Sequence, residues 1–276
     1  MVFIRVYPDQ EFAVFRQHFY AYKWEGMSVG DKNKVATSFP SIKVPKSSDS
    51  YYINPCGNMA GYHAHKGAWD QQNMTEMCGG VTGGPFFIFD KTNMTTNPPH
   101  LGQVFAVSAF TKFTAHTAEV MTKLNEIWFG VPGTTDTFPS NGYDLQTIIS
   151  YSDKGFYEGI QEWGSRLLTR HGKTLNRRET DDTVNYLGYW TDAGAYYYYN
   201  TEPGKNYEET MLDVYNEIRH GDTPVPFRSW NYDSWWYYKC NDNGGPGHMS
   251  HGAVKNWTAM PQVFPHGMDS LYQQTS

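Results

Sequence analysis

The first half of the chain alternates short apolar runs with turn-forming residues. Val, Phe and Ile dominate residues 2–7, 11–19, 84–90 and 102–110. Clusters of Gly, Pro, Asn and Asp separate these runs and predict turns. Because many short strands with such turns are typical of packed β-sheets, we expect a β-sandwich domain over residues 1–172.

The hydrophobic period changes over residues 155–171. Apolar side chains there share one helical face: Phe156, Ile160, Trp163, Leu167 and Leu168. This spacing predicts a helix that connects the sandwich to the second half of the chain. The polar stretch 172–182 comes next and predicts a domain boundary near 172–183, with a second domain over residues 183–276.

The second domain begins with a strand–helix–strand pattern. An apolar strand is predicted at 184–190 and another at 226–233. Between them lies an amphipathic helix at 206–221, with Asn206 as its N-cap. A crossover of this length joins parallel strands, which predicts a βαβ unit. The expected fold class is mainly β, with a β-sandwich followed by an incomplete α/β unit like the start of a TIM barrel.

Acidic and aromatic side chains gather at the ends of both predicted strands. They are Trp190, Asp192, Asp233, Trp235, Trp236 and Lys239. Carboxylates accept hydrogen bonds from hydroxyl groups, and flat aromatic rings cover sugar rings. We therefore expect these side chains to line one carbohydrate-binding surface. A purely structural interpretation stays open, in which the acids cap turns, the tryptophans are buried and the lysine is solvated.

Composition narrows the classes of function. Aromatic residues make up 17% of the 276 residues, with 21 Tyr and 9 Trp, which fits either a sandwich core or a carbohydrate-facing surface. The net charge is −6 and there is no Lys/Arg run, so we expect no nucleic-acid partner. No apolar stretch approaches the ~20 residues of a membrane span, so we expect no membrane partner.

Metal and cofactor motifs are weak. His63 and His65, and likewise His248 and His251, have spacings that suit chelation, but no third ligand is evident beside either pair. The glycines of residues 78–85 precede a strand without the Gly-Lys-Ser/Thr of a phosphate loop, so we expect a turn where backbone approaches backbone. With no dinucleotide fingerprint or catalytic Cys-His pattern either, we expect no metal and no cofactor.

Several features favour a secreted or lumenal location. N-glycosylation sequons occur at Asn73, Asn93 and Asn256. Cys56 and Cys78 are candidates for a disulfide across a loop. Residues 1–17 lack a charged segment followed by an apolar run, so the expected signal peptide is not part of this sequence.

Segments 188–200, 231–239 and 263–271 together resemble the opening of the catalytic barrel in α-galactosidase-like and raffinose-synthase-like glycoside hydrolases. Asp233-Ser234-Trp235 is similar to their second acid, small residue and Trp, and residues 264–268 (FPHGM) are similar to their helix opener. Members of this kind also begin with a large β-sandwich. One departure is Tyr232, which stands where the family has the first acid of a pair.

The resemblance implies the N-terminal part of a secreted hydrolase of the retaining α-glycosidase type. Its catalytic carboxylates would lie on later strands, outside this chain, so this chain would contribute substrate-binding residues. The remainder of the polypeptide, or another subunit, would then pack on residues 185–276, since an open barrel exposes strand edges. The alternative is a non-catalytic secreted protein derived from a glycosidase, which binds a carbohydrate or a pigment or is structural.

Overall fold

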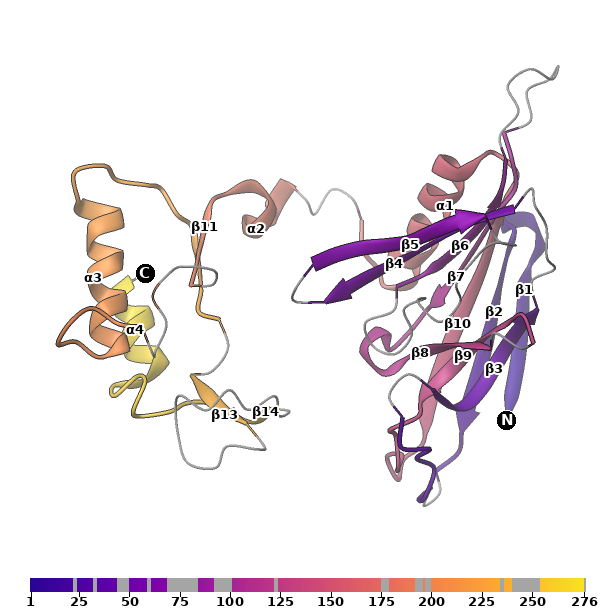
Figure 1. Cartoon of the computed structure of the whole chain (residues 1–276), viewed down its shortest axis with the longest axis horizontal. Coiled ribbons are helices and arrows are strands. Elements are labelled where there is room, and N and C mark those ends of the chain that lie inside the picture. Colours follow the sequence, from indigo (N-terminus) through magenta and orange to yellow (C-terminus); the bar gives the residue numbers. More distant parts are fainter. Residues whose placement is uncertain are drawn as a thin grey trace. The chain divides into compact units, whose positions relative to one another are not determined.

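The chain folds into two compact units, Met1–Thr174 and Leu175–Ser276, which are described separately (Figure 1). The division falls inside the stretch 172–183 where the sequence places a boundary. The computed structural model describes residues 1–21, 24–31, 34–43, 50–58, 61–68, 84–91, 101–121, 124–174, 179–191, 196, 200–233, 236–239 and 254–275, without the side chains of 56–58, 61–65 and 68.

The larger sheet of the first unit has seven strands, and every pairing in it is antiparallel (Figure 1). In spatial order the strands are β1 (Val2–Tyr7), β2 (Phe12–Phe19), β10 (Tyr143–Ser152), β7 (Val104–Ala109), β6 (Phe86–Asp90), β4 (Ser50–Asn58) and β5 (Gly61–Ala68). A 3-10 turn, η1 (Pro8–Gln10), joins β1 to β2. The apolar runs in the first half of the sequence correspond to β1, β2, β6 and β7, which confirms those strands.

A smaller sheet packs on the inner face of the larger one. It consists of β3 (Val35–Lys43), β9 (Glu126–Pro132) and β8 (Thr117–Met121), and η5 (Phe113–Ala115) precedes β8. One buried cluster joins the two sheets: Tyr52, Phe86, Ile88 and Val107 from the larger, and Ala118, Ile127 and Phe129 from the smaller. The prediction of a mainly β chain that begins with a β-sandwich is confirmed.

The helix predicted over 155–171 is confirmed as α1 (Phe156–Arg170), which packs on the outer face of the larger sheet. Alternate strand residues serve the two faces, so Ile148 packs with α1 while Ile149 faces the sandwich. The helix lies close to the sheet at Gly159, where an added Cβ would lie 3.0 Å from a side-chain carbon of Val104. Trp163 anchors the helix by donating its indole N–H to the Ser108 hydroxyl at 3.0 Å.

The glycine-rich run before β6 brings backbone against backbone, as expected, at Gly84. Its N–H donates to the Pro55 carbonyl at 2.9 Å, and an added Cβ would lie 2.4 Å from that oxygen. Residues 78–83 of the run lie outside the described residues.

The second unit contains the predicted βαβ arrangement. Strands β11 (Gly188–Trp190) and β12 (Ser229–Asn231) pair in parallel, and α3 (Tyr207–His220) lies between them in the chain. The first strand is shorter than predicted, because residues 184 and 185 belong to a helical turn, α2 (Asp182–Asn185). The Asp181 carboxylate causes this by accepting the Thr183 N–H at 2.9 Å as an N-cap.

The aromatic stretch 231–239 does not form one strand. After β12 the chain turns, and β13 (Tyr237–Lys239) pairs antiparallel with β14 (Val254–Ala259) in a separate two-stranded sheet. Helix α4 (Gly267–Thr275) begins at the glycine of the FPHGM segment, where the resemblance places a helix opener.

The core of the second unit forms between α3, the β13 segment and the chain around α4. Its buried members are Tyr207, Met211, Trp236, Met260, Val263, Phe264 and Leu271. Glu208 is also buried, and its carboxylate accepts the His266 N–H at 3.0 Å. The last part of the chain therefore covers α3 and completes this core.

The cap of α3 gives a first testable prediction. Asn206 accepts the Glu209 N–H at 2.9 Å, and the Glu209 carboxylate accepts the Asn206 N–H at 2.9 Å. Asn206→Ala removes one acceptor and should cost about 1 kcal/mol, which lowers the hydrogen-exchange protection of the α3 amides roughly fivefold. Thr223→Ala, at an exposed position beyond the helix, should leave that protection unchanged. Equal protection in both variants would contradict the assigned cap.

Candidate functional site

The ends of the two parallel strands meet in the second unit. Trp190 on β11 lies opposite Asn231 on β12, and the Thr191 N–H donates to the Asn231 carbonyl at 3.2 Å. The Asp233 N–H then donates to the Thr191 hydroxyl oxygen at 3.0 Å. Thr191 is fully buried. The residues that come after the strands are thereby fixed side by side, at the end where (β/α)-barrel enzymes place their sites.

Tyr207, the first residue of α3, also lies at the ends of β11 and β12, beside Thr191. Tyr207 is 4% exposed and its side chain hydrogen-bonds that of Thr191. Burial raises the pKa of Tyr207 to about 12, and the negative charge of Asp233 adds to this shift against the opposing effect of the Thr191 bond. The Tyr207 phenol therefore stays neutral, next to a carboxylate, over the whole physiological range.

A further tyrosine, Tyr237, lies near Asp233, and Tyr232 is its neighbour in the chain. Burial raises the pKa of Tyr237, and the Asp233 charge raises it further. The Tyr232 ring packs edge-on against that of Phe264, with 5.9 Å between the ring centres, and burial raises the pKa of Tyr232 as well. Its hydroxyl finds no hydrogen-bond partner within the described part of the chain. The phenols of Tyr207 and Tyr237, both within reach of the Asp233 charge, thus stay neutral and add no charge to the site.

Of the six residues that the sequence groups as one site, the structure describes four and buries two of them. Asp233 is half-buried at the strand ends, and Trp190 is 53% exposed on β11. Trp236 lies in the core and donates its indole N–H to the Tyr232 carbonyl at 3.2 Å, so its ring is not available to a ligand. Lys239 is buried on β13, with its ammonium group 5.4 Å from the Tyr237 ring centre.

Asp192 and Trp235 lie outside the described residues. Two residues of the site were not predicted from the sequence. A single threonine between Trp190 and Asp192 has no sequence feature that marks it as a site residue. Tyr207 shows the helical period of a core position, and only its place at the start of the helix indicates that its hydroxyl faces the strand ends.

The other predicted sites are only partly described. Asn256 lies on β14 in an exposed position, and its side-chain oxygen accepts the Thr258 hydroxyl at 2.7 Å. Asn73, Asn93, Cys78 and the pair His248 and His251 fall outside the described residues, as do the side chains of Cys56, His63 and His65.

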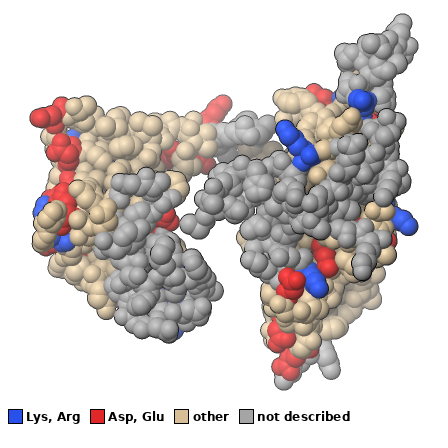
Figure 2. Space-filling model, in the orientation of Figure 1, with Lys and Arg blue, Asp and Glu red and all other residues tan. Residues whose placement is uncertain are grey.

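Within the described ranges, no group of three or more His, Cys, Asp or Glu side chains is arranged to hold a metal ion. The helices described there are all too short or too polar to cross a membrane. Figure 2 shows acidic and basic side chains interspersed on the face drawn of each unit. The Lys205 ammonium group of the second unit lies 2.7 Å from Glu202 and also contacts Asp213.

Comparison with known proteins does not assign this chain to a family. No protein-family model matches this sequence, and no curated protein matches it. The assignment of a function therefore rests on the residues and on the geometry at the ends of β11 and β12.

Proposed function

We propose that the ends of β11 and β12 bind a carbohydrate, and that the chain is the N-terminal part of a secreted glycoside-hydrolase-like protein. The observation that carries this proposal is the parallel βαβ unit whose strand ends are joined by the hydrogen bond from Asp233 to Thr191. The sandwich that precedes the unit, and the helix that opens at Gly267, agree with the same architecture.

The chemistry of the site suits a polyhydroxylated ligand. The Asp233 carboxylate accepts hydrogen bonds from sugar hydroxyls, and the neutral phenol of Tyr237 nearby donates them. The exposed ring of Trp190 offers an apolar face for the C–H side of a sugar ring.

Substrate binding, rather than bond cleavage, is the role we assign to these residues. Hydrolysis with retention needs two carboxylates about 5–5.5 Å apart. The described part of the site contributes Asp233 alone. By the resemblance to α-galactosidase-like enzymes, the catalytic pair would lie on later strands, elsewhere in the polypeptide or in another subunit that packs on residues 185–276.

A second candidate is a non-catalytic carbohydrate- or pigment-binding or structural protein. Tyr232 favours it, because a buried phenol stands where the related enzymes carry an acid that recognises hydroxyls. A measurement of glycoside hydrolysis distinguishes the two candidate functions. Release of phenol from aryl α-glycosides by the native protein supports the hydrolase, and glycan binding without any turnover supports the second candidate.

The proposed contact predicts a loss of glycan affinity on removal of the Asp233 charge. Asp233→Asn keeps the shape of the side chain but weakens a charge-assisted hydrogen bond of about 1.5–3 kcal/mol, so the dissociation constant should rise at least about tenfold. A glycan array on the whole chain identifies the ligand, and calorimetry measures the constants.

The matched control is Asp222→Asn, which removes an exposed carboxylate of the same unit outside the site. It should bind as the unchanged protein does. Equal affinities for Asp233→Asn and the unchanged protein would show that Asp233 does not contact the glycan. An array without any bound glycan would refute carbohydrate binding altogether.

A further inference from the structure

Three arginines meet on the outer face of the seven-stranded sheet, at the side where α1 ends. The strand registers bring two of them there, because Phe3 on β1 lies opposite Arg16 on β2, and Arg16 lies opposite Gln146 on β10. Arg5 lies in the next row, opposite Val14. Side chains two apart on β1 share a face, so Arg5 points to the same side as Phe3.

A groove of about 600 Å³ runs over these rows. The last residue of α1, Arg170, forms part of its wall. The lining residues are Phe3, Ile4, Arg5, Tyr7, Val14, Arg16, Phe110, Gln146 and Arg170. Three of them are arginines and none is acidic, in a chain whose net charge is −6.

Aromatic rings hold the guanidinium groups in place. The Arg16 guanidinium lies 5.6 Å from the ring centre of Phe3, and that of Arg170 lies 5.8 Å from the ring centre of Phe110. Arg5 donates to the Tyr7 hydroxyl at 3.5 Å. Stacked arginines lose less side-chain freedom on binding a ligand, which makes the groove preorganised for an anion.

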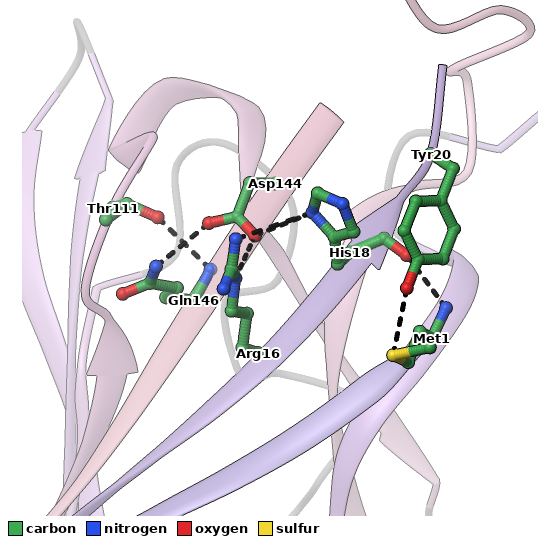
Figure 3. Close-up of polar contacts among 7 residues, drawn as sticks. All are labelled: Met1, Arg16, His18, Tyr20, Thr111, Asp144 and Gln146. Carbon is green, nitrogen blue, oxygen red and sulfur yellow. Dashed lines mark hydrogen bonds and ion pairs between the residues drawn. The ribbon is translucent and has the colours of Figure 1, made fainter. Parts of the chain in front are cut away.

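One arginine is already neutralised. The Asp144 carboxylate bonds the Arg16 Nε, accepts the Gln146 amide at 2.9 Å, and lies 3.4 Å from a ring nitrogen of His18 (Figure 3). No ion pair with a carboxylate is found for Arg5 or Arg170 among the residues that the structure describes. Within the described residues, two positive charges of the groove therefore have no acidic partner.

We propose that this groove binds a small organic anion, with a carboxylate, sulfate or phosphate group held by Arg5 and Arg170 and a ring or apolar body against Phe3, Tyr7 and Val14. The planar guanidinium fork matches the oxygens of all three groups. The volume is that of a small-molecule site and exceeds what a bare inorganic anion fills. This site lies in the first unit and is independent of the carbohydrate contact at Asp233.

Calorimetry on the whole chain with four ligands that share one body tests the proposal. These are glucuronate, glucose 6-sulfate, glucose 6-phosphate and neutral glucose. At least one anionic ligand should bind at least about tenfold more tightly than glucose in low salt, and the advantage should shrink as salt is added. The ranking of the three anions identifies which group the arginines prefer. If no anion binds more tightly than glucose, the proposal is wrong.

Variants locate the binding. Arg5→Gln and Arg170→Gln remove exposed charges and should each weaken the best anion about tenfold, while Lys91→Gln, which removes a cation that lies over the Tyr51 ring elsewhere in this unit, should not. Anion binding that survives both arginine substitutions would overturn the assignment to this groove. Asp233→Asn should leave anion binding intact, so failure of the carbohydrate site and failure of this groove give different results.

Discussion

Phe129→Ala is expected to lower the free energy of unfolding of the sandwich by about 3–5 kcal/mol. Phe129 on β9 is 2% exposed, and it belongs to the cluster that joins the two sheets. Its ring meets that of Phe86 edge-on, with 5.8 Å between the ring centres. Truncation removes this contact and leaves a cavity between sheets whose backbones are fixed by antiparallel pairing, so little collapse can fill it.

Urea unfolding at neutral pH measures this effect. Tyr157→Ala is the control, because that aromatic side chain is 71% exposed on the outer surface of α1, and its loss should change the stability by less than about 0.5 kcal/mol. If the two substitutions cost the same, the region around Phe129 is not the core that joins the sheets.

Acid should destabilise the first unit between about pH 6.5 and pH 4 through His116. Its imidazole is 6% exposed, and its Nε2 lies 2.8 Å from the Thr147 hydroxyl. Burial lowers the pKa of His116 from 6.5 to about 4, against a smaller opposing effect of the backbone at Thr117. Because the folded pKa is depressed, the contribution is fully present above pH 6.5, where the unfolded state is also neutral, and is lost as the pH falls through this window.

The size of the effect depends on the gap between the two pKa values. At about 1.4 kcal/mol for each pH unit, the unfolded state gains roughly 3 kcal/mol over the folded state by pH 4. Urea unfolding at a series of pH values should show one extra proton taken up on unfolding between pH 6 and pH 4.5. His116→Gln should flatten this slope by one proton. A slope that the substitution leaves unchanged would show that His116 is not buried in its neutral form.

The sandwich and its helix could be predicted because their apolar residues recur with a clear period. Residues 155–171 repeat on one helical face, and the strands at 2–7 and 102–110 are bounded by turn residues. Helix α3 carries in addition an N-cap, Asn206, that can be read directly from the sequence. In these segments local preference and tertiary packing agree.

The stretch 231–239 could not be divided from the sequence, because Trp and Tyr give no period there. Six of its nine side chains have an apolar body and a polar end, so the pattern does not distinguish the end of β12 from the start of β13. The burial of Trp236 and Lys239 depends on contacts with distant segments such as β14 and the chain around Phe264. The convergence of Thr191, Tyr207 and Asp233 is likewise a product of tertiary structure.

The location of a bound neutral glycan is the most direct test of the account. An isotopically labelled sample of the whole chain can be titrated with the best neutral ligand from the array, while backbone amide shifts are followed by NMR. The account predicts that the largest shifts occur at Trp190, Thr191 and Asp233, at the ends of β11 and β12, and that Asp233→Asn moves their titration midpoint to an at least about tenfold higher ligand concentration. Shifts confined to residues 1–174, or shifts at the strand ends whose midpoint Asp233→Asn leaves unchanged, would contradict it.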